Sequence, residues 1–137
     1  TNGKNPNFNT QELYVGLGYG PASVKYSRST SNYFGTNNTA GTQYYQADVK
    51  QSLAPLSASL KDLNVVAHYG RTAVANYGSA SYNDINAGLV YTLPKEWDLG
   101  VRYYTNSSMT NYFKYENTFG GTKLYSDAVV FDLKKTF

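Results

Sequence analysis

Apolar and polar residues alternate with a period of two along most of this chain, and such alternation is typical of β-strands. In the segment 12–19 (ELYVGLGY), Leu, Val, Leu and Tyr occupy the odd positions, while Glu, Tyr and Gly occupy the even positions. Further segments of the chain alternate in the same way. We therefore expect an all-β chain with about seven antiparallel strands, at residues 12–19, 23–30, 43–53, 63–70, 84–93, 97–104 and 123–137.

The connections between these segments alternate between short turns and long polar loops. The turns at 20–22 and 94–95 are tight, whereas the loops at 31–42 and 106–122 are long and rich in small polar residues. Outer-membrane β-barrels have short periplasmic turns and long outer loops, and strands of about 9–11 residues suit a tilted crossing of the bilayer. We therefore expect a single domain over 1–137, forming an up-and-down transmembrane β-barrel in the bacterial outer membrane.

The two faces of the predicted strands differ in chemistry. One face is apolar and tends to end in aromatic residues, which barrels place in girdles at the two membrane interfaces. The predicted interfacial aromatics are Tyr19, Tyr69, Tyr91, Trp97, Tyr103 and Phe137. The other face is polar, and the predicted lumen-lining residues are Glu12, Lys25, Asp48, Lys50, His68, Asp84, Asp98, Arg102, Asp132 and Lys134. Because these residues carry both signs of charge, we expect at most weak ion selectivity.

The last segment ends in an aromatic residue preceded by alternating apolar residues, a pattern that the outer-membrane assembly machinery reads in barrels generally. The residues of this predicted assembly signal are Val129, Phe131, Leu133 and Phe137. If the last strand ends in the periplasm, the first strand runs from the outer surface towards the periplasm. Residues 1–9 are then the remnant of an outer loop. Bacterial barrels have an even number of strands, so we expect the C-terminal part of a larger barrel, or a piece that another chain completes.

Composition and charge narrow the picture further. The mean hydropathy of −0.51 agrees with a barrel wall, because alternating apolar and polar residues average to a low value. The apolar runs are too short for a transmembrane helix, and the chain has no Cys for a disulfide framework. The basic residues behind the net charge of +3 are dispersed, so no nucleic-acid partner is indicated. The expected partners are outer-membrane lipids, lipopolysaccharide and the assembly machinery, together with the missing part of the barrel or another chain.

Candidate chemistry is sparse. His68 is the single histidine, which excludes sites built from several histidines, and we expect no metal and no cofactor. Ser27, His68 and Asp84 are candidates for a hydrolytic triad, but nothing in the sequence fixes a nucleophile beside a base. We therefore interpret His68 as structural or pore-lining and expect no enzymatic activity. Strand curvature, rather than phosphate binding, explains the inward-facing glycines Gly16, Gly18, Gly88 and Gly100.

Six short motifs, in this order, resemble those of the TorF family of proteobacterial porins. The motifs are QELYVGL (11–17), VKYSRS (24–29), NYFG (32–35), AHYG (67–70), YND (82–84) and KKTF (134–137). No single motif is distinctive, but together they span the chain from residue 11 to its end. The resemblance implies a pore-like outer-membrane barrel whose physiological substrate is undetermined. The family's signal peptide and first strands have no counterpart here, in agreement with the strand count.

Four functions are compatible with these patterns. The first is a porin-like barrel for passive diffusion of small hydrophilic solutes. The second is a structural or adhesive surface protein, in which a plugged barrel displays aromatic loops around 33–34 and 112–113. The third is an outer-membrane hydrolase, which requires that activity depend on His68. The fourth is a Tyr-rich carbohydrate-binding sandwich that is soluble without detergent.

Overall fold

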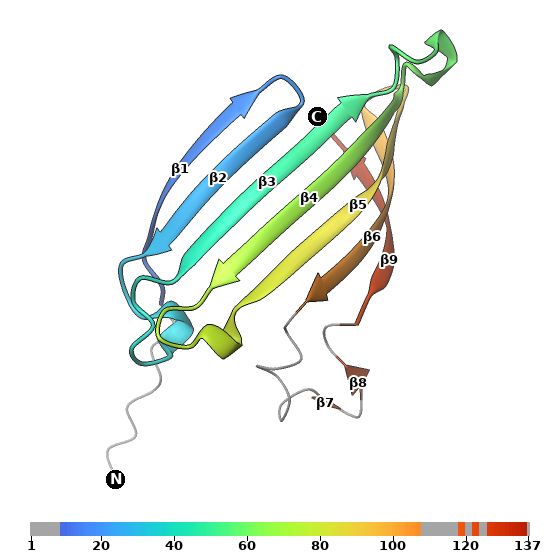
Figure 1. Ribbon diagram of the computed structural model, residues 1–137. Helices are drawn as coiled ribbons and strands as arrows, with labels where there is room; N and C mark the ends of the chain where they lie inside the picture. Colours follow the sequence, from blue (N-terminus) through green and yellow to red (C-terminus); the bar gives the residue numbers. More distant parts are fainter. Residues whose placement is uncertain (1–8, 108–117, 120–121, 124–125, 137) are drawn as a thin grey trace.

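The structure is a computed structural model, and it describes residues 9–107, 118–119, 122–123 and 126–136. Seven of its strands form one antiparallel sheet (Figure 1). In spatial order they are β1 (Glu12–Tyr19), β2 (Ala22–Ser29), β3 (Gln43–Ser52), β4 (Leu63–Ala73), β5 (Tyr82–Leu93), β6 (Trp97–Ser107) and β9 (Ala128–Lys135). The short strands β7 (Thr118–Phe119) and β8 (Thr122–Lys123) pair with each other. The prediction of an all-β chain with seven antiparallel strands is confirmed for the described residues.

Strand boundaries differ from the prediction mainly at one end of the sheet. There β4 continues to Ala73, β5 begins at Tyr82 and β6 continues to Ser107. Most residues at these ends are polar on both faces, so alternation does not mark them. The predicted strand 123–137 was wrong in its first part, because Lys123 belongs to β8 and β9 begins at Ala128. The stretch KLY at 123–125 continues the alternation, and this misplaced the boundary.

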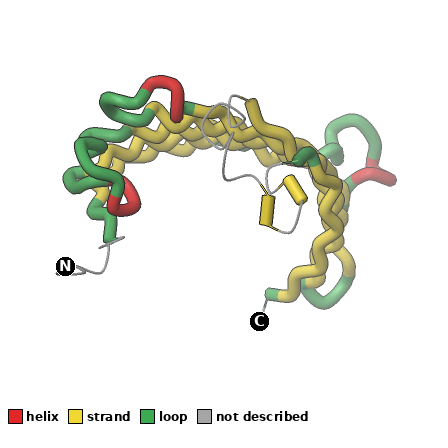
Figure 2. The backbone as a smooth tube through the Cα atoms, turned by 90° about the horizontal axis from the view of Figure 1, so that it is seen from below, coloured by secondary structure: helices red, strands yellow, loops and turns green. Residues whose placement is uncertain are grey.

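The seven-stranded sheet curves into an open trough (Figure 2). Its edge strands are β1 and β9, and within the described part of the chain these two do not pair with each other. Each of the other five strands pairs with the strand before it and the strand after it in the spatial order, so the sheet is an antiparallel meander. The described strands therefore form an open sheet rather than a closed barrel.

Polar residues line the inside of the trough. The register places Ser27 opposite Tyr44, and Tyr44 opposite Thr72, so these three side chains share one face. Ser27 and Thr72 are 4% and 1% exposed, whereas Leu17 on the other face is 75% exposed. Side chains on the inside of a curved sheet crowd together and those on the outside spread apart. The polar face is therefore the concave one, and the apolar face is convex.

The structure has little conventional core. Among the described residues, the buried hydrophobic side chains are those of Ala80 and Val90. Other apolar side chains lie mostly on the exposed convex face. In the part of the chain that the structure describes, no helix has the length and apolar character needed to span a membrane.

The connections do not alternate between short and long as regularly as predicted. At one end, β1 and β2 are joined by two residues, of which Gly20 has φ +57°, a left-handed conformation that glycine adopts without steric cost. At the same end, however, the connection 53–62 contains the 3-10 helix η2 (Ala58–Leu60) and is longer than the connection 74–81 at the other end. The strict alternation of short and long connections is therefore wrong at this position.

The connections 30–42 and 74–81 pack together at the other end of the sheet. They contain the 3-10 helices η1 (Tyr33–Gly35) and η3 (Gly78–Ala80). The Thr42 hydroxyl donates to the carbonyl of Thr39 at 2.8 Å and accepts from the backbone N–H of Ala75 at 3.1 Å. These buried threonine contacts hold the two loops to each other and to the sheet.

Candidate functional site

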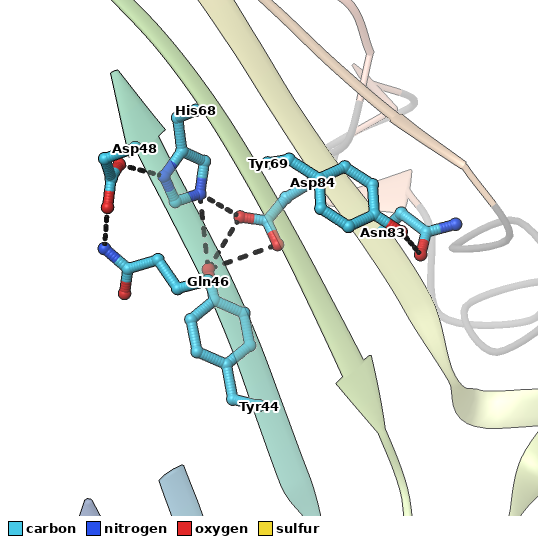
Figure 3. A network of polar contacts seen from close by, with 7 residues as sticks. All are labelled: Tyr44, Gln46, Asp48, His68, Tyr69, Asn83 and Asp84. Atoms are coloured by element: carbon cyan, nitrogen blue, oxygen red, sulfur yellow. Dashed lines mark hydrogen bonds and ion pairs between the residues drawn. The ribbon is translucent and has the colours of Figure 1, made fainter. Parts of the chain in front are cut away.

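A chain of polar side chains crosses three neighbouring strands on the concave face (Figure 3). His68 on β4 lies between Asp48 on β3 and Asp84 on β5. The Nδ1 atom of His68 is 2.7 Å from Oδ1 of Asp48, and its Nε2 atom is 3.0 Å from Oδ1 of Asp84. Asp48 lies directly opposite His68 in the sheet register, whereas Asp84 reaches His68 diagonally. One imidazole thus joins carboxylates from both adjacent strands.

Two further residues of β3 extend this network. The Tyr44 hydroxyl donates to Oδ1 of Asp84 at 3.1 Å, and its oxygen lies 3.3 Å from Nε2 of His68. The Gln46 side-chain amide donates to Oδ2 of Asp48 at 2.6 Å. Sequence reasoning missed both residues as site members. Their even positions on β3, the same as that of Asp48, were the available signal, because alternate residues of a strand share a face.

The centre of the network is an imidazole, a group that can exchange a proton, and it is partly shielded from water. Both ring nitrogens of His68 face carboxylate oxygens, which are acceptors, so an imidazole that carries two protons donates to both. The His68 side chain is 17% exposed and those of Asp48 and Asp84 are 36% exposed. The arrangement is therefore suited to proton exchange with water on the concave side and to ordering three strands relative to one another.

Glycines on the concave face leave room for polar side chains or for the backbone of the next strand. A Cβ atom at Gly70 would overlap the Tyr44 hydroxyl and the Asp84 carboxylate. A Cβ at Gly88 would lie 2.8 Å from Cα of Arg102, and one at Gly100 would lie 2.5 Å from the carboxylate of Asp132. We expected Gly88 and Gly100 to ease curvature. Gly100 makes space for the Asp132 side chain on the next strand, and Gly88 allows the backbone of β6 to approach closely.

A second charged pair lies two strands away from His68. The Nε atom of Arg102 on β6 is 3.8 Å from Oδ1 of Asp132 on β9, which is too long for a hydrogen bond. That Nε atom is buried and has no hydrogen-bond partner among the described residues. Four residues before Arg102 on β6, Asp98 accepts a hydrogen bond from the Thr92 hydroxyl at 2.8 Å. The carboxylate of Asp98 is thus held locally, while the guanidinium of Arg102 keeps unused donors.

All the residues predicted to line a lumen lie on the polar face in the observed register: Glu12, Lys25, Asp48, Lys50, His68, Asp84, Asp98, Arg102, Asp132 and Lys134. The structure brings five of these together, namely the group around His68 and the pair around Arg102. Lys25 lies instead over the ring of Tyr14, with Nζ 5.2 Å from the ring centre. The concave face therefore carries a dispersed set of charges with one dense cluster.

The predicted interfacial aromatics that the structure describes lie on the convex face. They are Tyr19, Tyr69, Tyr91, Trp97 and Tyr103, while Phe137 lies outside the described residues. The Tyr69 hydroxyl donates to Asn83 at 3.1 Å, and the Tyr103 hydroxyl donates to Asp127 at 2.7 Å. The hydrogen bond from Tyr103 lowers the pKa of Asp127, and a hydrogen bond from Thr105 lowers it further by a smaller amount. Both phenols thus reach towards the end of the sheet that bears the loop 30–42.

The hydrolytic triad considered from the sequence is assembled in part. His68 and Asp84 are in contact, but both ring nitrogens of His68 face carboxylates, and Tyr44 rather than Ser27 approaches Nε2. No ring nitrogen therefore remains to activate the Ser27 hydroxyl in this arrangement. Within the described ranges, no group of three or more His, Cys, Asp or Glu side chains is placed to hold a metal ion.

Fold and site together define a class of protein: an all-β chain whose curved antiparallel sheet has a charged concave face and an apolar convex face. A family model described as "Bacterial protein of unknown function (Gcw_chp)" matches residues 1–137. The chain therefore belongs to this bacterial family. No curated protein and no solved structure matches the chain.

Proposed function

We propose that this chain forms part of the wall of a β-barrel in the bacterial outer membrane, and that the barrel is a porin-like channel. In this proposal small hydrophilic solutes diffuse passively along the concave, polar side of the sheet. The observation that carries the proposal is the convex side, which is broad, apolar and uncovered. The resemblance to the TorF porins agrees with it.

The convex face exposes large apolar side chains on every strand of the sheet. They include Leu13, Val15, Leu17, Val24, Val49, Tyr69, Ile85, Leu89, Leu99, Val129, Phe131 and Leu133. Soluble monomers rarely expose a contiguous apolar patch larger than a few hundred Å². Seven strands spaced by about 4.8 Å make a face well above that size. Acyl chains of a bilayer cover such a face, and the strands between the two edges β1 and β9 are paired on both sides, so their backbone groups are satisfied within the sheet.

Polar residues border this apolar face at both ends of the strands. Arg28 and Arg71 are exposed near the loop 30–42, and Gln51 and Lys135 are exposed near the opposite end. The Lys135 ammonium lies over the ring of Trp97, 5.2 Å from its centre. Aromatic rings and long cationic side chains gather at membrane interfaces, because each has an apolar body and a polar tip. The order polar, apolar, polar along the strands matches the layers of a bilayer.

Closure of the barrel requires further strands. Successive strands of the sheet are antiparallel, so β1 and β9, its first and seventh strands, run in the same direction. A fully antiparallel barrel is completed by one strand that runs opposite to both, or by another odd number of strands. The total is then even, as in bacterial outer-membrane barrels. These strands belong to the same polypeptide or to another chain.

The same sheet supports a second candidate, a surface protein whose barrel is plugged. Phe34 is 60% exposed, has φ +45°, and packs against the ring of Tyr33 at 4.6 Å. Burial raises the pKa of Tyr33 to about 12. A large residue held in a left-handed conformation is unfavourable, and such positions cluster at functional sites. Adhesion through this loop is the function that this observation favours.

Liposome swelling separates the two candidates. We expect the full-length protein, refolded into proteoliposomes, to admit arabinose faster than the larger sugar raffinose. Heat-denatured protein in the same lipid is the control. Exclusion of arabinose would contradict the channel and favour the plugged surface protein. Recovery of the protein in the soluble fraction without detergent would contradict a membrane location altogether.

A further inference from the structure

A hollow of about 310 Å³ lies on the concave face beside the His68 network. Its lining includes Ser23, Lys50, His68, Asn86 and Arg102. The hollow lies between two cationic residues of the same row of the sheet. In that row the register runs from Lys50 through Val66 and Gly88 to Arg102.

We propose that this hollow binds the carboxylate of a small hydroxylated solute, with Lys50 and Arg102 as the anion-binding residues. The inference rests on the proposed function in one respect, namely that the solute reaches the concave face from the channel. Binding itself does not require that the channel be open.

The two cationic side chains of the hollow have hydrogen-bond donors that no described residue uses. Within the part of the chain that the structure describes, Lys50 forms no ion pair and no side-chain hydrogen bond. The Arg102 guanidinium forms no hydrogen bond with a described residue, and its buried Nε atom is 3.8 Å from Asp132. A guanidinium has five N–H donors in a planar fork that matches a carboxylate, and an ammonium adds a point charge. A bound carboxylate would satisfy donors that the described side chains leave unused.

The acidic member of the hollow is already engaged. Oδ1 of Asp48 faces Nδ1 of His68, and Oδ2 accepts from the Gln46 amide. Both of its oxygens are therefore engaged in hydrogen bonds within the network, and they are not free to bind a cationic solute. With Asp48 engaged in this way, the two cations determine the sign of the ligand, and that sign is negative.

Neutral groups in the hollow suit hydroxyls on the same solute. Asn86 offers an amide and Ser23 a hydroxyl, and neither side chain has a hydrogen-bond partner among the described residues. Both groups donate and accept, which is what a sugar-like hydroxyl requires. The hollow therefore fits a polyhydroxy acid better than a simple inorganic anion.

The test compares gluconate with sorbitol, a neutral polyol of the same carbon number. Calorimetric titration of the detergent-refolded, full-length protein should detect gluconate and give at least about tenfold weaker binding of sorbitol. Lys50→Gln and Arg102→Gln should each weaken gluconate binding about tenfold. Lys134→Gln is the matched control, because it removes a cation from the same face but outside the hollow. Arg102→Lys keeps the positive charge but loses the planar guanidinium, so its affinity for gluconate should lie between those of the wild type and Arg102→Gln. This variant keeps the test decisive if Arg102→Gln does not fold.

Several results would overturn the inference. They are equal affinity for gluconate and sorbitol, an equal loss in Lys134→Gln, or no binding of gluconate at all. The swelling assay fails or succeeds separately. Gluconate binding without arabinose entry would support this site and contradict the channel. Arabinose entry without gluconate binding would support the channel and contradict this site.

Discussion

His68 and Asp48 face each other across β4 and β3, with Nδ1 of the ring 2.7 Å from Oδ1 of the carboxylate. The same ring also contacts Asp84 on β5 at 3.0 Å. The His68 side chain therefore lies between two carboxylates, one from each strand that pairs with β4. Without the imidazole, two negative charges would face each other across a single strand, which is unfavourable. His68 is therefore a link that sets the spacing of three strands on the concave face.

Removal of this link should destabilise the protein moderately. We expect His68→Ala to lower the free energy of unfolding by about 1–2 kcal/mol, because two carboxylates lose charge-assisted hydrogen bonds. The value lies in the lower part of the range for such bonds, since both carboxylates are 36% exposed and screened by water. Urea unfolding in lipid vesicles, followed through the fluorescence of the single Trp, Trp97, measures it.

A double-mutant comparison tests the cause of that loss. In a protein that already carries Asp48→Asn and Asp84→Asn, His68→Ala should cost clearly less than in the wild type. An undiminished loss in that background would show that His68 acts through other contacts.

Gly88 should tolerate no side chain. A Cβ atom there would overlap the carbonyl oxygen of Val101 and approach Cα of Arg102, so backbone atoms would have to move. We expect Gly88→Ala to cost about 1–3 kcal/mol of folding free energy in the same urea titration. The matched control is Gly18→Ala on the same face, where the nearest atoms are 3.9 Å away. Equal effects at both positions would contradict the close-approach explanation.

The hydrogen bond from Tyr103 to Asp127 should be visible in a pH titration. This bond is the main cause of the lowered pKa of Asp127, so Tyr103→Phe should raise that pKa towards the ordinary value of about 3.9. A carboxylate with a lowered pKa stabilises the fold above its unfolded pKa, and that stabilisation is lost as the pH falls through the lowered value. Carbon-13 NMR of the Asp127 carboxyl measures the shift.

Tyr69→Phe is the control for this titration. It removes a phenol hydroxyl from the same face, one that bonds to Asn83 instead. The pKa of Asp127 should stay unchanged in this variant, and an unchanged value in Tyr103→Phe as well would contradict the role of the Tyr103 hydroxyl.

The faces of the sheet were predictable from the sequence, and its ends were not. A shift of one residue in register would turn Leu17 or Phe131 to the wrong face, so alternation fixes which side chains lie together. Near Ala73, Tyr82 and Ser107, both faces are polar, and hydrogen bonding alone decides where strands stop. Alternation also carries no information about how far the sheet curves.

The candidate site was predictable in its members more than in its contacts. Asp48, His68 and Asp84 were expected on one face. Their contact depends on the register between strands and on the space that Gly70 leaves, which a single sequence does not specify. The part played by Tyr44 became evident only from the position of its hydroxyl between Asp84 and His68.

Phe131 distinguishes a lipid-facing convex surface from a water-facing one. Its side chain is 77% exposed, so in a soluble sheet Phe131→Arg would change stability by no more than about 0.5 kcal/mol. In a barrel wall, an arginine facing lipid near the bilayer midplane costs about 2–4 kcal/mol. We expect the larger loss in urea titrations of the protein in vesicles. Gln51→Arg, at the polar border of the same face, should cost no more than about 1 kcal/mol, since the guanidinium reaches the headgroups there. Small and equal effects at both positions would contradict a membrane-facing surface, because water solvates an arginine equally well at either site.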